Sequence, residues 1–192
     1  IEIFEGDIRN KEDILKAVEG VDNIFHEAAL VSVPDSIKNP HKCRKTNITG
    51  TIHLLNAANK SNVKKIIFAS SAAIYGNDPK IPKRESMKAY PASPYAESKI
   101  MGEESFIKYE KHFNMKCMCL RYFNVYGPRQ DPNSQYSGVI SKFIGKMLNK
   151  EQPIVFGDGK QTRDFVYVND IVNANMLAMK SKIRGKIANI GT

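Results

Sequence analysis

Strands and helices alternate along most of this 192-residue chain, and this order restricts the fold more than any other feature of the sequence. Short apolar runs rich in β-forming residues, such as KKIIFASS and MKCMCLRYF, are separated by amphipathic segments long enough to form helices. The expected strands are 1–8, 23–29, 64–71 and 115–123, and the expected helices are 11–19, 38–60 and 94–112. This alternation predicts an α/β fold, a doubly wound parallel sheet that binds ligands at the carboxyl ends of its strands.

The pattern changes after Asn124, where a turn-rich loop follows the strand. Beyond that loop we expect a helix at 139–150, short strands at 153–157 and 165–169, a helix at 170–181 and a last strand at 187–192. Residues 125–166 are therefore predicted to form part of a smaller lobe that binds substrate, and 167–192 to return to the main domain. A cleft between two lobes is a usual place for a small ligand.

Composition restricts the class of protein. With 42% hydrophobic and 26% charged residues, no apolar run near the length of a membrane span and no leader pattern, the chain is expected to be cytoplasmic and away from membranes. The cysteines lack metal-ligand spacing, so we expect reduced thiols and no metal. The net charge of +9 is dispersed; it favours small phosphorylated ligands, with nucleic acid as a weaker alternative.

The stretch SPYAESK carries the most specific chemistry. Ser93 and Pro94 are typical of a helix N-cap and first helical position, so a helix is predicted to begin here. Tyr95 and Lys99 are then four residues apart on one face, and an ammonium near a phenol favours the phenolate. The pair could be a catalytic base. For this spacing alone, a half-buried tyrosine beside a solvated lysine is the commoner interpretation.

Several loops with distinct chemistry fall at one edge of the predicted sheet: GDIRN, HEAA, SSAAIYG, YAESK and RYFNVYGPRQDP, followed by RDFVYVND. Together they resemble the extended short-chain dehydrogenase/reductase family, in its branch of NAD-dependent sugar-nucleotide epimerases and dehydratases. The resemblance covers essentially the whole chain and is greatest to UDP-hexose 4-epimerases, including those that act on N-acetylated UDP-hexosamines. It implies NAD as cofactor and a UDP-sugar as substrate.

The resemblance assigns roles residue by residue. The catalytic residues that it implies are Ser71, Tyr95 and Lys99. The cofactor contacts that it implies are Asp7, Ile8, Ala28, Ala29, Val31, Asn47, Ser70, Tyr95, Lys99, Tyr122 and Phe123. The substrate contacts that it implies are Ser71, Asn124, Arg129 and Arg163, with Gln130 as a further candidate. Without the resemblance, a helix cap is an equally good interpretation of Asp7. Asn47 would then be interpreted as a surface residue, and Tyr122 and Phe123 as core residues.

The resemblance also implies a mechanism and its alternatives. Tyr95, ionised beside Lys99, would remove a proton from the sugar 4-hydroxyl while a hydride passes to NAD. Family members that eliminate water carry an Asp-Glu pair where this chain has Ala72 and Ala73, which favours 4-epimerisation. The alternative functions are those of a UDP-uronate 4-epimerase, of another nucleotide-sugar reductase, and of a cofactor-sensing protein without turnover.

The resemblance bears on organisation as well. The family begins with a strand and a G-x-x-G-x-x-G turn that are not found in this sequence, so residues 1–124 are expected to be an incomplete NAD-binding, Rossmann-like domain of a fragment. The fragment alone is expected to bind NAD poorly and to be inactive. The helices at 38–60 and 94–112 would pair in a homodimer.

Overall fold

The main sheet is parallel throughout. The computed structural model describes residues 1–113, 115–132, 134 and 138–192. The strands of the sheet are β1 (Asn23–His26), β2 (Lys65–Ser71), β3 (Lys116–Tyr122) and β6 (Lys186–Ile190), in the order β1-β2-β3-β6. β2 is buried almost along its whole length, as expected of a strand covered on both faces. The predicted α/β class with a parallel sheet is confirmed.

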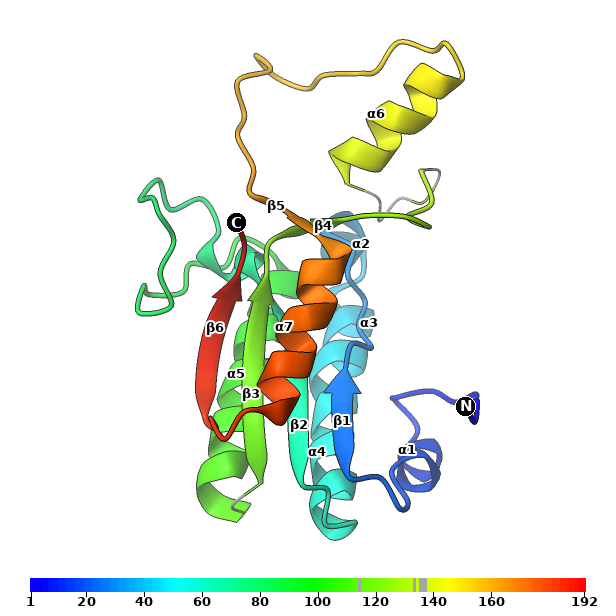
Figure 1. The fold of residues 1–192 in the computed structure, drawn as a ribbon, viewed down its shortest axis with the longest axis vertical. Helices are drawn as coiled ribbons and strands as arrows, with labels where there is room; N and C mark the ends of the chain where they lie inside the picture. Colours follow the sequence, from blue (N-terminus) through cyan, green and yellow to red (C-terminus); the bar gives the residue numbers. More distant parts are fainter. Residues whose placement is uncertain (114, 133, 135–137) are drawn as a thin grey trace.

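Helices cover both faces of this sheet (Figure 1). On one face lies α7 (Val168–Lys180), which packs Ala178 against Ile67 and Leu120. The other face carries α4 (Gly50–Lys60) and α5 (Pro94–Phe113), whose Leu55 and Phe106 are fully buried in the largest core cluster. Outside this layer, α1 (Lys11–Ala17) packs on α4. Within the described residues, no helix is long and apolar enough to cross a membrane.

The long helix predicted at 38–60 is interrupted. The structure has α2 (Val33–Lys38), then α3 (Pro40–Arg44), a π-helical turn at Lys45–Thr49, and α4 in direct continuation. α2 was not predicted, although its N-cap is plain: the Ser32 side chain accepts a hydrogen bond of 3.0 Å from the Asp35 backbone N–H. π-helical turns are rare and often occur at functional sites, and this one contains Asn47.

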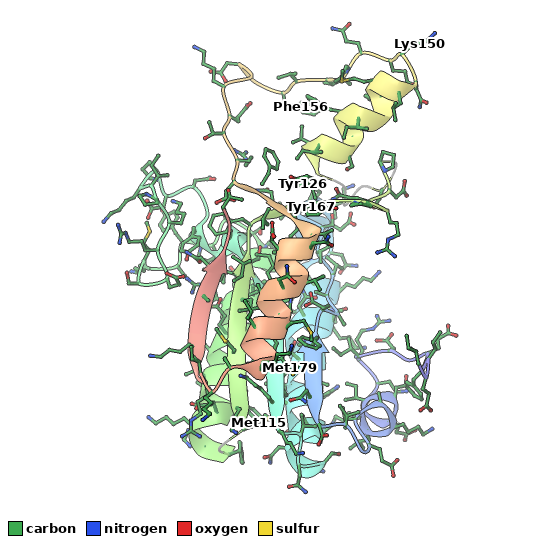
Figure 2. All side chains as sticks on the ribbon, in the orientation of Figure 1. Met115, Tyr126, Lys150, Phe156, Tyr167 and Met179 are labelled. Carbon is green, nitrogen blue, oxygen red and sulfur yellow. The ribbon has the colours of Figure 1, made fainter. Side chains whose placement is uncertain are left out.

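Two predicted strands are wrong. Residues 1–8 and 153–157 form no strand, since neither segment lies against a strand that could complete its hydrogen bonds, and residues 1–6 are exposed. A strand that was not predicted, β4 (Asn124–Tyr126), pairs in parallel with β5 (Phe165–Tyr167). This small sheet lies beyond the carboxyl ends of the main strands, and Figure 2 shows its Tyr126 and Tyr167 side by side, with ring centroids 5.6 Å apart.

Beyond the small sheet lies α6 (Val139–Leu148), away from the main sheet (Figure 1). None of its described residues is buried. The segment that joins α6 to β5 carries Phe156, which is 80% exposed and is labelled in Figure 2. The boundaries at 1–124, 125–166 and 167–192 remain predictions.

Close packing of α5 on β2 depends on Gly102. A Cβ atom at this position would lie 2.5 Å from Cζ of the buried Phe68 ring, closer than packed atoms can approach. In an exposed helix Gly→Ala stabilises by roughly 1 kcal/mol, but overpacking a core costs about 1–3 kcal/mol. We expect Gly102→Ala to lower the free energy of unfolding, measured by urea denaturation. An increase in stability would show that α5 can move away from β2 without loss.

Candidate functional site

The helix that carries the predicted catalytic pair begins as the sequence predicts. The Ser93 side chain accepts a hydrogen bond of 3.1 Å from the Ala96 N–H, and Pro94 is the first residue of α5. Tyr95 and Lys99 lie on one face of the helix, with the Lys99 ammonium 5.7 Å from the centre of the Tyr95 ring. The Tyr95 N–H also donates to the Ser36 hydroxyl at 3.2 Å, which attaches the start of α5 to α2.

Lys99 is buried, contrary to the solvated lysine of the commoner interpretation. Its ammonium donates a hydrogen bond of 2.6 Å to the Ala69 carbonyl and lies 4.9 Å from the centre of the Phe68 ring. Burial lowers the pKa of Lys99 to about 8, and the nearby Glu27 and Glu103 carboxylates act in the opposite direction. At neutral pH the ammonium form therefore still predominates.

The pKa of Tyr95 is raised, contrary to the expectation of an ionised phenol. Burial raises the pKa of the phenol, and the interaction with the Ser71 side chain opposes this rise only in part. The expected lowering of this pKa by Lys99 is not found, because the ammonium is bound to the Ala69 carbonyl and burial is the stronger effect. Within the chain itself the protonated phenol is the stable form.

Ser71 completes the cluster. It is the last residue of β2, and its Oγ accepts a hydrogen bond of 3.1 Å from the Ala73 N–H, which caps a 3₁₀ turn at Ala72–Tyr75. The same side chain interacts with the Tyr95 phenol and lowers its pKa. The structure therefore brings Ser71, Tyr95 and Lys99 together at the carboxyl end of β2, with two alanines as the next residues of the turn.

The loop after β1 is held by Asn47. From the π-helical turn, the buried Asn47 amide accepts from the Leu30 N–H at 2.7 Å and donates to the Leu30 carbonyl at 3.0 Å. It also donates to the Ser98 hydroxyl at 3.0 Å, which connects the loop to α5. Around Leu30, Ala28 and Val31 are exposed and Ala29 is half-buried, so small side chains line this strand end.

Other residues predicted to contact the cofactor make hydrogen bonds or ring contacts within the chain. Ser70 is turned into the core, where its hydroxyl donates to Glu103 at 2.6 Å. The Tyr122 hydroxyl lies 2.9 Å from a Glu27 carboxylate oxygen, and the half-buried Phe123 lies 6.5 Å from the Tyr75 ring. Their cofactor roles stay predictions.

The first two predicted cofactor contacts lie before α1. Both Asp7 carboxylate oxygens accept from the Arg9 side chain, and this contact lowers the pKa of Asp7 to about 2. Ile8 packs against Gly50 at the start of α4, where a Cβ atom would lie 3.0 Å from the Ile8 side chain. Ile8 thus has a packing role, and Asp7 keeps its charge well below neutral pH.

The predicted substrate contacts divide into two groups. Asn124 and Arg163 line a cavity of about 150 Å³ next to the small sheet, together with Gln130. The Asn124 side chain donates to the Asp164 carbonyl at 2.9 Å, which joins the start of β4 to the residue before β5. Arg129 is exposed and is not among the residues that line it. An arginine and an asparagine at one cavity are suited to bind an anion such as a diphosphate.

Sequence reasoning missed the buried polar residues behind the cluster. Glu103 and Arg121 form an ion pair of 2.7 Å with both side chains about 5% exposed. Arg121 also donates to the Tyr75 hydroxyl at 2.9 Å. The available signal was the spacing of Tyr95, Lys99 and Glu103, which places a carboxylate on the same helical face one turn beyond the lysine.

His26, at the end of β1, is buried and hydrogen-bonded within the core. The Thr51 hydroxyl donates to the Asn47 carbonyl at 2.7 Å, so it accepts from the His26 Nε2–H, 2.8 Å away. Burial lowers the pKa of His26 to about 3. The unfolded chain, with a histidine pKa of about 6.5, therefore binds more protons between these values, and stability present above pH 6.5 is lost as the pH falls.

We expect this histidine to produce a slope of about 1.4 kcal/mol per pH unit in the free energy of unfolding below about pH 6.5. Urea denaturation at about pH 7.5 and about pH 5 measures it. The slope should shrink in His26→Gln and persist in His41→Gln, because His41 is exposed on α3. Equal slopes in the two variants would show that another group causes the acid sensitivity.

The unused hydrogen-bonding capacity at Lys99 fits a cofactor. An ammonium has three donors, and among the described residues only the Ala69 carbonyl accepts one of them. Buried donors without acceptors are unfavourable, so the remaining ones suit the hydroxyl groups of a bound ribose. Within the same part of the chain, no group of three or more His, Cys, Asp or Glu side chains is arranged to hold a metal ion.

Comparison with protein families gives a match over residues 1–191 to the NAD dependent epimerase/dehydratase family. Among curated proteins, the chain is 44% identical over 193 residues to a putative UDP-glucose 4-epimerase of Methanocaldococcus jannaschii. The match covers 100% of this chain and 62% of that protein. The chain thus spans about three fifths of the length of this relative.

Solved structures give the same result. A UDP-N-acetylglucosamine 4-epimerase from Methanobrevibacter ruminantium, in complex with UDP-N-acetylmuramic acid, matches with a TM-score of 0.93 and 41% identity over 97% of this chain and 59% of its own. A UDP-glucose 4-epimerase from Thermotoga maritima, with UDP-glucose, matches with a TM-score of 0.94 and 40% identity, and the match covers 98% of this chain and 62% of its own. A Thermus thermophilus UDP-glucose 4-epimerase in complex with NAD matches with a TM-score of 0.92 and 36% identity, and the match covers 100% of this chain and 64% of its own.

Proposed function

This chain belongs to the NAD-dependent epimerase/dehydratase family, and we propose that its protein interconverts the C4 epimers of a UDP-hexose or UDP-N-acetylhexosamine. The observation that carries the proposal is the meeting of Ser71, Tyr95 and Lys99 at the end of β2, with alanines at the next two positions. NAD is the cofactor of the family.

Each side chain has a task in this reaction. When bound, NAD supplies a hydride acceptor for the sugar C4 and a positive charge that offsets the effect of burial on Tyr95. The Tyr95 phenolate then removes the proton of the 4-hydroxyl as a general base. Ser71, whose side chain interacts with the phenol, would hold the reacting oxygen. Lys99 would use its remaining donors to hold the ribose hydroxyls of the cofactor and so orient it.

The substrate is held from the small-lobe side. Arg163 and Asn124 line one cavity and would bind the diphosphate, where the planar guanidinium can donate two hydrogen bonds at once. This anchorage would keep the nucleotide in place while a 4-keto sugar turns its other face to the hydride. Water elimination needs an acid and a base beside Ser71, and Ala72 and Ala73 can transfer no proton.

The test is a proton NMR time course of the anomeric region with the full-length protein and catalytic NAD. UDP-glucose and UDP-N-acetylglucosamine are supplied in separate tubes. We expect a galacto-configured signal to appear in at least one tube, and its identity reports the accepted C2 substituent. No new sugar signal with NAD demonstrably bound would refute both substrates and favour a uronate or a protein that only senses NAD.

The proposal includes a cytoplasmic homodimer. The buried free thiols of Cys43, Cys117 and Cys119 suit a reducing compartment. Exposed apolar side chains on α4 and α5, such as Ile52 and Met101, suit helix packing against a second copy. Sedimentation equilibrium of the full-length protein measures the mass, and a monomer would refute the dimer.

A further inference from the structure

Three consecutive residues of β2 are joined to three residues of α5 that follow one another at one-turn spacing. Two of the contacts are hydrogen bonds, from Lys99 Nζ to the Ala69 carbonyl at 2.6 Å and from the Ser70 hydroxyl to Glu103 Oε1 at 2.6 Å. The third is the interaction of the Ser71 side chain with the Tyr95 phenol, which lowers the pKa of that phenol. The contacts of Lys99 and Tyr95 involve the residues that we assign to the chemistry. The hydrogen bond between Ser70 and Glu103 lies in the core and has no task in the proposed reaction.

The Glu103 carboxylate is also fixed from a third element. Its Oε1 accepts from Arg121 Nε at 2.8 Å and its Oε2 from the same guanidinium at 2.7 Å, a bidentate pair. Both side chains are about 5% exposed, so the geometry is shielded from water. Arg121 is on β3, directly before Tyr122. One buried carboxylate therefore connects α5, β2 and β3 just below the strand ends that carry the site.

We propose that Ser70 and Glu103 are positioning residues, whose hydrogen bond holds α5 in register with β2 so that Tyr95 and Lys99 face Ser71. This inference rests on the proposed function, because it concerns the geometry of that reaction. The physical reason is that a rigid helix moves as a unit. Lys99 is one turn and Tyr95 two turns from Glu103, so a displacement of the helix at Glu103 also displaces both side chains. A shift of about 1 Å in reacting groups can lower turnover about a hundredfold.

Glu103 acts on Lys99 by charge as well. The titratable groups around the ammonium are Glu27 and His26 of the β1 end, Cys43 of α3, and Tyr95 and Glu103 of α5. Burial lowers the pKa of Lys99 to about 8, and the Glu27 and Glu103 carboxylates oppose that fall. Removing the Glu103 charge should lower the pKa of Lys99 further, whereas a purely structural contact would leave it unchanged.

Ser70→Ala and Glu103→Gln test the proposal in the full-length protein, with Ser105→Ala and Glu104→Gln as matched controls on α5. Ser105 bonds only the Met101 carbonyl among the described residues, and Glu104 is exposed. We expect kcat to fall about tenfold or more in both test variants, with KM within about twofold and the controls unchanged. The alkaline limb of the pH profile should move to lower pH in Glu103→Gln alone.

A second measurement needs no turnover. Carbon-13 NMR of labelled lysine side chains, with the Lys99 signal assigned by its loss in Lys99→Met, gives the pKa of Lys99 directly. We expect a decrease of about half a pH unit or more in Glu103→Gln relative to Glu104→Gln. If the wild type epimerises no UDP-sugar, the proposed function fails, and this titration still tests the link from Glu103 to Lys99.

Two outcomes overturn the inference. One is an unchanged kcat in Ser70→Ala when the wild type is active, because this variant removes the hydrogen bond and leaves the ion pair with Arg121 intact. This result decides the matter even if Glu103→Gln does not fold. The other is the same pKa of Lys99 in Glu103→Gln and Glu104→Gln.

Discussion

Replacing Tyr95 with phenylalanine should lower kcat by about 10²–10⁴-fold, the contribution expected of a positioned general base. The phenol interacts with the Ser71 side chain, the centre of its ring is 5.7 Å from the Lys99 ammonium, and the substitution removes one oxygen atom from this site. Epimerisation by the full-length protein, followed by NMR with saturating NAD, measures the loss. The free energy of unfolding should change by only about 1 kcal/mol, because the substitution removes at most the polar interaction of one hydroxyl group.

Tyr109→Phe is the matched control. Tyr109 is on the same helix, and its hydroxyl lies 2.9 Å from the Asn56 side-chain oxygen, far along α5 from the site. We expect turnover within about twofold of wild type. Near-normal activity of Tyr95→Phe would refute Tyr95 as the base, and equal losses in the two variants would indicate a general effect of altering α5.

Replacing Arg121 with leucine should lower the free energy of unfolding by about 3–5 kcal/mol, because it leaves the Glu103 carboxylate buried without its countercharge. The Tyr75 hydroxyl loses the same partner, which it contacts at 2.9 Å. Urea denaturation at neutral pH measures the change. The double variant Arg121→Leu/Glu103→Leu should recover much of the loss, since apolar side chains can replace a buried ion pair.

Arg44→Leu supplies the comparison for an exposed pair. Arg44 and Glu97 are 3.3 Å apart, but their side chains are 65% and 49% exposed. Breaking such a pair costs about 0–1 kcal/mol. A loss in Arg121→Leu no larger than the loss in Arg44→Leu would show that the buried pair does not hold the sheet and α5 together.

Local patterns predicted the parts of the fold that depend on local chemistry. The buried strand at 64–71 and the helix that starts at Ser93 and Pro94 were found from composition and capping residues. The segments 1–8 and 153–157 have β-forming residues, yet no neighbouring strand supplies their hydrogen-bond partners. Strand formation depends on pairing with residues distant in the sequence. A prediction from composition alone therefore placed strands wrongly in both segments and did not include β4.

The sequence by itself determined the α/β order, the one-turn spacing of Tyr95 and Lys99, and the family to which the chain belongs. The tertiary structure alone decided the electrostatic state of that pair. Burial lowers the pKa of Lys99 and raises that of Tyr95, and neither shift is visible in spacing. It also revealed Glu103 as the buried anchor behind the site, because desolvation and hydrogen bonding depend on which elements pack together and on how closely they approach.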